Sequence, residues 1–152
     1  MLKETDEIKD DKITDKGALS GIKVLDLTRY LSGPQTTLFL SALGAEVVKI
    51  DDPNQGDPVR NSPPFFGKDG VSMSKASPLD IGIAYLKRAR SKKSIELDLK
   101  SEDGINTFMR LAEKADVIVE NFRVGVTKRL KIDYEQLKSK NPKVIYCSIT
   151  GF

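Results

Sequence analysis

An amide and a cation follow directly after a short apolar run in this chain. The segment 117–119, Val-Ile-Val, has the composition of a buried strand, and Asn121 and Arg123 come immediately after it. A second arginine, Arg129, follows a glycine and a short helical pattern. Amide and guanidinium groups donate the hydrogen bonds that a phosphorylated ligand accepts. The arginines could also be ordinary exposed helix residues, but their position beside a strand end favours a ligand site.

A dense basic run precedes another strand-like segment. The stretch KRARSKKS holds five cations within seven residues, namely Lys87, Arg88, Arg90, Lys92 and Lys93. Such a run is usually a solvated surface. It could instead clamp phosphates, since lysine and arginine hold them by charge and by donor geometry. The spacing by itself favours the solvated surface.

Other catalytic chemistry is poorly represented. Histidine is absent, which excludes His-based triads, His metal ligands and His general bases. The single cysteine, Cys147, follows the apolar residues 144–146 and is interpreted as a buried strand thiol rather than a nucleophile. Asp51, Asp52 and Asp57 lie in a Pro- and Gly-rich loop, where aspartates are more often turn formers than acid–base catalysts. The sequence therefore predicts no catalytic residue and no metal site here.

The turn RYLSGP, residues 29–34, also lacks the signatures of common nucleotide sites. It has neither the G-x-G-x-x-G of a dinucleotide fold nor a P-loop, so a conventional NAD or ATP site is disfavoured. Gly33 and the start of the following helix could still present backbone N–H groups to an anion. A plain tight turn is equally compatible with the pattern.

The composition is that of a soluble globular domain. Of 152 residues, 39% are hydrophobic and 31% charged, and the formal net charge is +3, which predicts neither nucleic-acid nor membrane binding. No apolar run approaches the ~20 residues that span a bilayer. Residues 1–18 are interpreted as a charged, flexible leader without the apolar core of a signal peptide. The single cysteine fits a reducing compartment, so we expect a cytoplasmic protein.

Strand and helix patterns alternate after the leader. Strands are predicted in the segments 21–30, 45–50, 93–99, 116–121 and 143–149. This alternation predicts an α/β fold, a Rossmann-like, doubly wound and mostly parallel sheet. Residues 51–90 are interpreted as an ordered loop or extended excursion because they are rich in Pro, Gly, Asp and Asn. Ligands of such folds lie outside the carboxyl ends of the strands, where Asn121 and Arg123 are expected.

Helices are predicted between these strands. The segment 33–44 should begin with Pro34 in its first helical position and bury Leu38, Phe39, Ala42 and Leu43. A second helix is predicted for 77–90, with Ser77 as its cap and Pro78 after it. The segment 101–115 should bury a stripe of Ile105, Phe108, Met109 and Ala112. Two further helical patterns cover 124–130 and 133–141, the latter capped by Asp133.

Six motifs in order give the chain a resemblance to a known family. They are LSGIKVLDLTRYLSGP, LGAEVVKID, GDPVR with the following PP, RSKKSIELDLK, ADVIVENFRVGV and RLKIDYEQLKSKNPKVIYCSITGF. Together they resemble the amino-terminal part of the class III CoA-transferases, which include formyl-CoA and carnitine CoA-transferases and α-methylacyl-CoA racemase. The resemblance covers nearly everything after residue 18.

This resemblance implies an activity and an assembly. Members move CoA between an acyl-CoA and a free carboxylic acid, through an aspartate that forms a mixed anhydride and then an aspartyl-CoA thioester. They form interlocked homodimers and hold no permanent cofactor. The nucleophilic aspartate is expected beyond residue 152, as are the catalytic residues of the racemase. Residues 19–152 are therefore expected to be a CoA-binding segment, incomplete in fold and inactive alone, which would need the remaining sequence in trans.

The resemblance also implies a set of CoA-binding residues. These are Tyr30, Lys92, Lys93, Asn121, Phe122, Arg123 and Arg129. The chain departs from the family pattern at several positions: SKKS replaces the frequent NKRS, FRVG replaces FRPG, and Lys131 replaces the usual glycine. A basic residue common after the second strand is absent, its place being taken by Asp51-Asp52-Pro53. Alternative functions are a non-catalytic CoA- or nucleotide-binding module, an inert remnant or, within the family, an acyl-CoA racemase.

Overall fold

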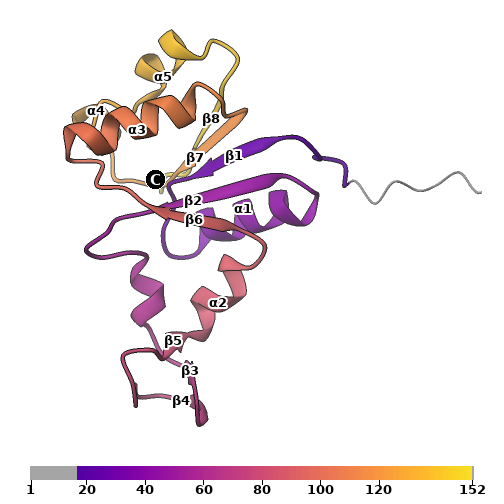
Figure 1. Cartoon of the computed structure of the whole chain (residues 1–152), viewed down its shortest axis with the longest axis vertical. Coiled ribbons are helices and arrows are strands. Elements are labelled where there is room, and N and C mark those ends of the chain that lie inside the picture. Colours follow the sequence, from indigo (N-terminus) through magenta and orange to yellow (C-terminus); the bar gives the residue numbers. More distant parts are fainter. Residues whose placement is uncertain (1–16, 152) are drawn as a thin grey trace, which may run out of the picture.

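Five parallel strands form the centre of the molecule. The computed structural model describes residues 17–151, so most of the predicted leader lies outside the described residues. The strands are β1 (Lys23–Asp26), β2 (Glu46–Asp51), β6 (Lys93–Glu96), β7 (Val117–Glu120) and β8 (Ile145–Ser148). Their spatial order is β6-β2-β1-β7-β8, and each pair is parallel (Figure 1). The predicted doubly wound α/β fold is confirmed.

The strand order has a reversal beside β1. The chain winds outward from β1 through β2 to β6, and then returns to the other side of β1 for β7 and β8. The direction of winding therefore reverses between β1 and β7. In sheets of this kind the crevice at the reversal, outside the carboxyl ends, is where ligands bind.

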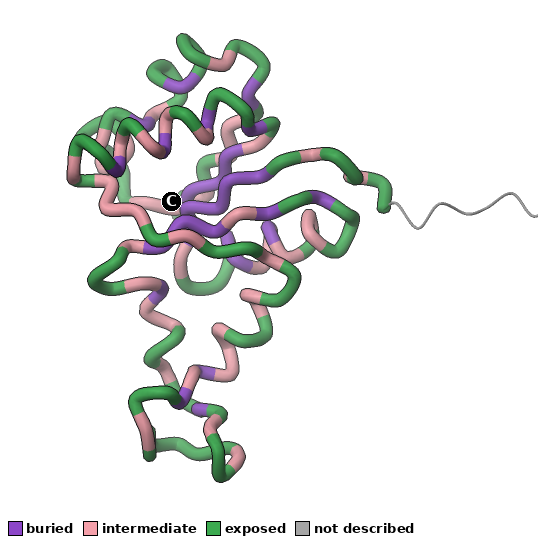
Figure 2. Tube along the Cα trace, in the orientation of Figure 1, coloured by how far each residue is buried: buried purple, intermediate pink, exposed green. Residues whose placement is uncertain are grey.

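Helices cover both faces of the sheet. One face carries α3 (Glu102–Ala112), α4 (Val126–Arg129) and α5 (Tyr134–Lys140), and the other carries α1 (Ser32–Ala42) (Figure 1). The larger core lies under α3 and α5, where the fully buried side chains include Phe108, Ile118, Ile132 and Leu137 (Figure 2). The predicted stripe of α3 is confirmed, as are the caps of α3 by Ser101 and of α5 by Asp133.

Helix α1 differs from its prediction. It begins at Ser32, so Pro34 is its third residue rather than its first. Its buried residues are Gly33, Pro34 and Thr37, whereas Phe39 is 60% exposed and Leu43, just after the helix, is 50% exposed. The predicted apolar face is therefore wrong. The physical reason is that the sheet beneath α1 is polar at this end, so small and hydroxylated residues pack against it.

Residues 51–90 leave the main sheet, as predicted, and return to it. They contain a short helix η1 (Pro58–Asn61), then β3 (Phe65–Gly67), β4 (Gly70–Ser72) and β5 (Ile81–Gly82), which form a small antiparallel sheet, and α2 (Ile83–Ala89) (Figure 1). The predicted helix 77–90 is too long. Ser77 accepts from the Leu79 amide inside a turn, and Asp80 accepts from the amides of Ala76 and Ser77, so the helix starts only at Ile83.

Residues 17–151 contain neither a membrane-spanning helix nor a metal-binding cluster. None of the helices there is long and apolar enough to cross a membrane. No group of three or more His, Cys, Asp or Glu side chains in this part of the chain is arranged to hold a metal ion.

Candidate functional site

The turn after β1, residues 28–30, is held by side chains from three different elements. Asn121, just after β7, accepts from the Arg29 amide at 2.9 Å and donates to the Arg29 carbonyl at 2.8 Å. Asp26 accepts from the amide and the hydroxyl of Thr28. Asn121 thus joins β1 to β7 at the point where the winding reverses, which is where its position in the sequence predicted it to lie.

Tyr30 occupies an unusual backbone conformation in the same turn. Its φ is +70°, in the left-handed region that non-glycine residues rarely adopt. Its amide donates to Asp57 at 3.2 Å, and its ring is left 58% exposed. Asp57 also accepts from the Val59 amide and so caps the short helix η1. The strained turn is therefore fixed from the excursion as well as from the sheet.

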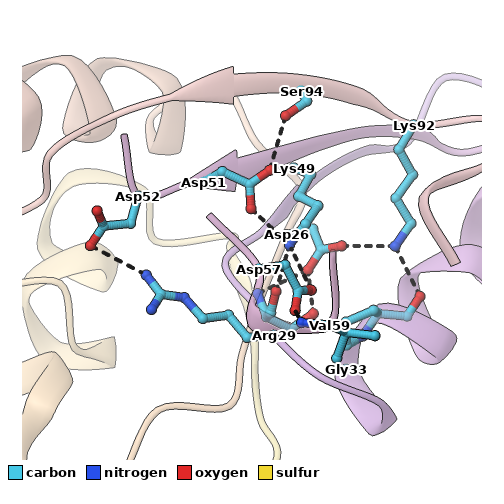
Figure 3. A network of polar contacts seen from close by, with 12 residues as sticks. Asp26, Arg29, Gly33, Lys49, Asp51, Asp52, Asp57, Val59, Lys92 and Ser94 are labelled. Carbon is cyan, nitrogen blue, oxygen red and sulfur yellow. Dashed lines mark hydrogen bonds and ion pairs between the residues drawn. The ribbon is translucent and has the colours of Figure 1, made fainter. Parts of the chain in front are cut away.

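A buried polar layer lies under this turn (Figure 3). Side chains alternate between the two faces of a strand, so Asp26, Lys49, Asp51 and Ser94 all stand on the face covered by α1. Asp26 is opposite Lys49 in the sheet register, and Lys49 is opposite Ser94. The Ser94 hydroxyl donates to Asp51 at 3.1 Å. The parallel strands thus carry charges where a buried sheet normally carries apolar side chains.

Lys49 is the central cation of this layer. It is 3% exposed, and its Nζ donates to the Thr28 carbonyl at 2.8 Å. The same Nζ lies 3.2 Å from the Asp51 carboxylate and 3.5 Å from that of Asp57. Asp51, Asp52 and Asp57 were predicted to be turn formers, and Asp52 and Asp57 do accept turn amides. Asp51 and Asp57 also neutralise Lys49, which the sequence did not reveal.

Lys92 lies in the same layer, so the predicted solvated surface is wrong for this residue. Its side chain is 2% exposed, and its Nζ donates to Asp26 at 3.0 Å, to the Pro34 carbonyl at 2.9 Å and to Thr37 at 2.7 Å. Burial lowers the pKa of this ammonium, although the charge of Asp26 acts in the opposite direction. All three donors of the ammonium are used inside the chain.

Lys93 points elsewhere. It is the first residue of β6, its side chain is 72% exposed, and it pairs with Glu46, the first residue of β2, at 2.6 Å. The hydrogen bond and charge of Lys93 hold the pKa of Glu46 below its ordinary value. The structure therefore separates the two lysines: Lys92 is buried behind the first turn, and Lys93 lies on the surface at the amino ends of the strands.

Phe122 and Arg123 line an open groove at the carboxyl edge. The groove has a volume of about 290 Å³ and is formed by two short segments, 121–124 and 149–151. Arg123 is exposed and Phe122 half-buried. An aromatic ring and a cation at such an edge could hold a base and a phosphate, respectively.

Arg129 lines a second, larger groove of about 770 Å³ between α3 and the end of α4. Lys100 and Lys131 line it too; the sequence did not single out Lys100, and it noted Lys131 only as a departure from the family pattern. Lys131 has a φ of +57°, in the left-handed region. Glycine adopts this region without steric cost, which agrees with the glycine that the family resemblance leads us to expect at this position.

Arg29 is the other residue that the sequence prediction missed. Its guanidinium lies 3.6 Å from the Asp52 carboxylate and 6.0 Å from the centre of the Phe122 ring. Burial alone would raise the pKa of Asp52, but the amides of Asn54 and Gln55 and the charges of Arg29 and Lys100 outweigh it and lower that pKa. Arg29 could have been found from its place in the sequence, because it is a cation directly after the first strand.

The edge is thus suited to binding rather than to acid–base chemistry. Cations line both grooves, and they lie at the carboxyl ends of the strands beside an aromatic ring. The buried carboxylates Asp26, Asp51 and Asp57 are already engaged by lysines. An elongated polyanion with an aromatic group fits these features.

Comparison with known proteins identifies the family. Residues 19–152 match the family described as CoA-transferase family III. The chain belongs to CoA-transferase family III. The resemblance inferred from the six sequence motifs is therefore confirmed.

Relatives in CoA-transferase family III include enzymes from several kinds of organism. The chain is 42% identical over 136 residues to succinyl-CoA:mesaconate CoA-transferase of Haloarcula hispanica, which covers 90% of this chain and 32% of that protein. It is 40% identical over 135 residues to human succinyl-CoA:glutarate CoA-transferase, covering 88% of this chain and 28% of that protein. The chain thus spans about a third of the length of the curated relatives it matches.

A solved structure from the same family has the same fold. A CAIB/BAIF family protein from Brucella suis superposes with a TM-score of 0.78 at 38% sequence identity. The match covers 90% of this chain and 34% of that chain. The doubly wound sheet described above therefore also occurs in that protein.

Proposed function

We propose that this chain binds the CoA portion of an acyl-CoA at the carboxyl edge of its sheet. It would thereby form the CoA-binding part of an enzyme that moves CoA between an acyl-CoA and a free carboxylic acid. The observation that carries this proposal is the groove just after β7 that Phe122 and Arg123 line. Three cations line the second groove, between the start of α3 and the end of α4. The names of the relatives, all CoA-transferases, support the same ligand.

The predicted site residues take different roles in this proposal. Phe122 offers a surface for the adenine, while Arg123 and Arg129 hold phosphates. Asn121 fixes the turn that carries Tyr30, which meets the ligand through its exposed ring. The last two predicted residues are lysines with weaker roles: Lys92 acts by anchoring Asp26 and the start of α1, and Lys93 contributes a screened surface charge.

The proposed transfer needs an aspartate supplied from outside the buried layer. Its carboxylate would attack the acyl-CoA carbonyl and expel the CoA thiolate, leaving a mixed anhydride. The thiolate would then attack the aspartyl carbonyl, which releases the first carboxylic acid and forms an aspartyl-CoA thioester. Asp26, Asp51 and Asp57 are unsuitable because each is buried against a lysine. We also propose that the complete enzyme forms the interlocked homodimer that the family resemblance implies.

A stand-alone CoA-binding module is the second candidate. It is favoured by one observation: the grooves and the turn are built entirely from residues 28–151 of this chain. Both candidates predict CoA binding, but only the first predicts transfer once the remaining sequence is provided. No observation favours a racemase.

Calorimetric titration of the full chain with CoA tests the proposal. Arg123→Met and Arg129→Met should each raise the dissociation constant about 10-fold or more, the scale of a charged hydrogen bond. Arg110→Met is the matched control, because it removes an exposed arginine near the end of α3, away from the grooves. No binding by the wild-type chain, or equal losses in all three variants, would contradict the proposal.

An exchange assay separates the two candidates. The chain is mixed with the remaining two thirds of a relative such as that of Haloarcula hispanica, and CoA exchange between succinyl-CoA and free carboxylic acids is followed. Exchange by the mixture, but not by the chain alone, supports the transferase. CoA binding without exchange under any of these conditions leaves the stand-alone module.

A further inference from the structure

Arg29 occupies the reversal point of the sheet with a guanidinium that the fold hardly uses. Its side chain is 26% exposed, and its contacts within residues 17–151 are the 3.6 Å ion pair with Asp52 and the face of the Phe122 ring, whose centre lies 6.0 Å away. The guanidinium makes no hydrogen bond within that described part of the chain. An arginine has five N–H donors, so nearly all of its binding capacity is free.

The neighbouring cations of the polar layer, in contrast, are fully engaged within the chain. Lys92 spends its three donors on Asp26, Pro34 and Thr37. Lys49 is buried between two carboxylates and the Thr28 carbonyl. Among the cations around the first turn, Arg29 is therefore the one suited to an incoming anion.

The backbone of Arg29 is fixed much more firmly than its side chain. Its amide and its carbonyl are both bonded to Asn121, and the residues on either side are held by Asp26 and Asp57. A cation on so rigid a support loses little conformational freedom when a ligand binds. This arrangement is typical of an arginine that is preorganised to bind a ligand, rather than of an ordinary surface arginine.

Arg29 also links the two grooves. Phe122, beside its guanidinium, lines the groove that contains Arg123. Asp52, its ion-pair partner, is close enough to Lys100 to feel that charge, and Lys100 lines the groove that contains Arg129.

We infer that Arg29 is a ligand-contacting residue that exchanges Asp52 for a phosphate group of CoA. The inference rests on the proposed CoA-binding function and adds a residue to it. A partly exposed ion pair at this distance is weak, so a phosphate can replace the carboxylate at little cost. A planar guanidinium can then bind two phosphate oxygens at once.

Calorimetry on the full chain and its variants tests this contact. Arg29→Met removes the charge and keeps the length of the side chain, and it should weaken CoA binding about 10- to 100-fold. Arg29→Lys should recover part of the loss, since it restores charge without the planar fork. Arg110→Met should change the affinity by less than about two-fold because its charge is exposed and distant.

Asp52→Asn tests the same contact through a gain of affinity rather than a loss. It removes the competing carboxylate and leaves the guanidinium in place, so CoA should bind about two- to five-fold more tightly. Thermal unfolding of each variant confirms that the fold is kept. Weaker binding in Asp52→Asn, with the fold intact, would overturn the exchange of Asp52 for phosphate.

Two further ligands, dephospho-CoA and succinate, identify the group that Arg29 meets. If the loss in Arg29→Met disappears with dephospho-CoA, the contact is the 3′-phosphate, and if it persists there, the contact is the pyrophosphate. A loss seen only with succinate would overturn the phosphate contact in favour of a carboxylate. An unchanged CoA affinity in Arg29→Met overturns the inference and leaves the proposed function standing. Absence of CoA binding by the wild-type chain overturns both.

Discussion

At the scale of single residues, the side-chain amide of Asn121 contributes to the fold itself, whatever it contributes to a ligand. Its side chain is bonded in both directions to the main chain of Arg29, so it closes the sheet at its reversal point. The sequence predicted that Asn121 follows β7 and contacts a ligand there. It could not show that the partner is the neighbouring turn, because residues 29 and 121 meet only after β1 and β7 pair.

Lys131 provides a prediction about backbone strain. A glycine there would relieve the cost of the left-handed conformation but would lose more entropy on folding. Lys131→Gly should therefore raise the free energy of unfolding by about 0.5–1 kcal/mol, measured by urea denaturation. Lys128→Gly, in the helical conformation of α4, should instead lower it by about 1 kcal/mol. Destabilisation by both changes would show that Lys131 is not strained.

Tyr146 provides a prediction about alkaline pH. Burial, together with the negative charge of Glu120, raises the pKa of its phenol. The folded chain therefore keeps a proton that the unfolded chain releases above pH ~10, and the stabilisation present below that pH is lost as the pH rises. Above pH 10 the unfolding free energy should fall more steeply in the wild type than in Tyr146→Phe, by up to about 1.4 kcal/mol per pH unit.

The control for this measurement is Tyr134→Phe. It removes the hydroxyl of the exposed ring that packs against Tyr146 at 6.2 Å. Urea denaturation of all three proteins at pH 8 and at pH 10.5 gives the slopes. Equal slopes in the wild type and Tyr146→Phe would disprove a buried, proton-retaining phenol.

At the scale of elements, α1 and the sheet face beneath it show where sequence patterns fail. The apolar residues of α1 recur at helical spacing, yet its buried face is Gly33, Pro34 and Thr37. The face of the sheet below carries Asp26 and Lys49, and Thr37 donates to Asp26. In contrast, α3 was predicted correctly because it covers an apolar face. Helical periodicity identifies the buried side only where the opposing surface is apolar.

The polar layer itself left a trace in the sequence. Polar residues occupy every second position near the ends of the first two strands, as Asp26 and Thr28 do in one and Lys49 and Asp51 in the other. This spacing of two is the spacing of one face of a strand. Which of these residues pair, and that Lys92 joins them across a long stretch of sequence, depends on the strand register and could not be predicted.

Gly33 tests how tightly α1 must pack on the first turn. A Cβ at this position would lie 2.3 Å from the Cβ of Thr28, so the helix or the strand would have to move. Gly33→Ala should lower the free energy of unfolding by about 1–3 kcal/mol, the usual cost of overpacking, and should weaken CoA binding by displacing the turn. Gly151→Ala is the control for stability alone, since no atom lies within 4 Å of its added Cβ but the residue lines the groove with Arg123. Unchanged stability in Gly33→Ala would show that the contact is not tight.

At the scale of the whole molecule, the fold separates support from binding. The apolar core under α3 and α5 stabilises the sheet, the polar layer under α1 shapes the first turn, and the cations that line the two grooves lie beyond the carboxyl ends of the strands. A doubly wound, mostly parallel sheet was predictable from the alternation of elements. The grooves were not, because segments 99–106 and 129–131 meet only in three dimensions.

Hydrogen–deuterium exchange of the full chain, with and without CoA, tests the central claim most directly. If CoA binds at the carboxyl edge, amides in residues 28–33 and 121–130 should exchange more slowly with the ligand. The amino ends of the strands, including residues 44–47 and 143–145, should be unaffected. Protection of the amino ends or of the small sheet at 65–82, without protection of 121–130, would contradict the account.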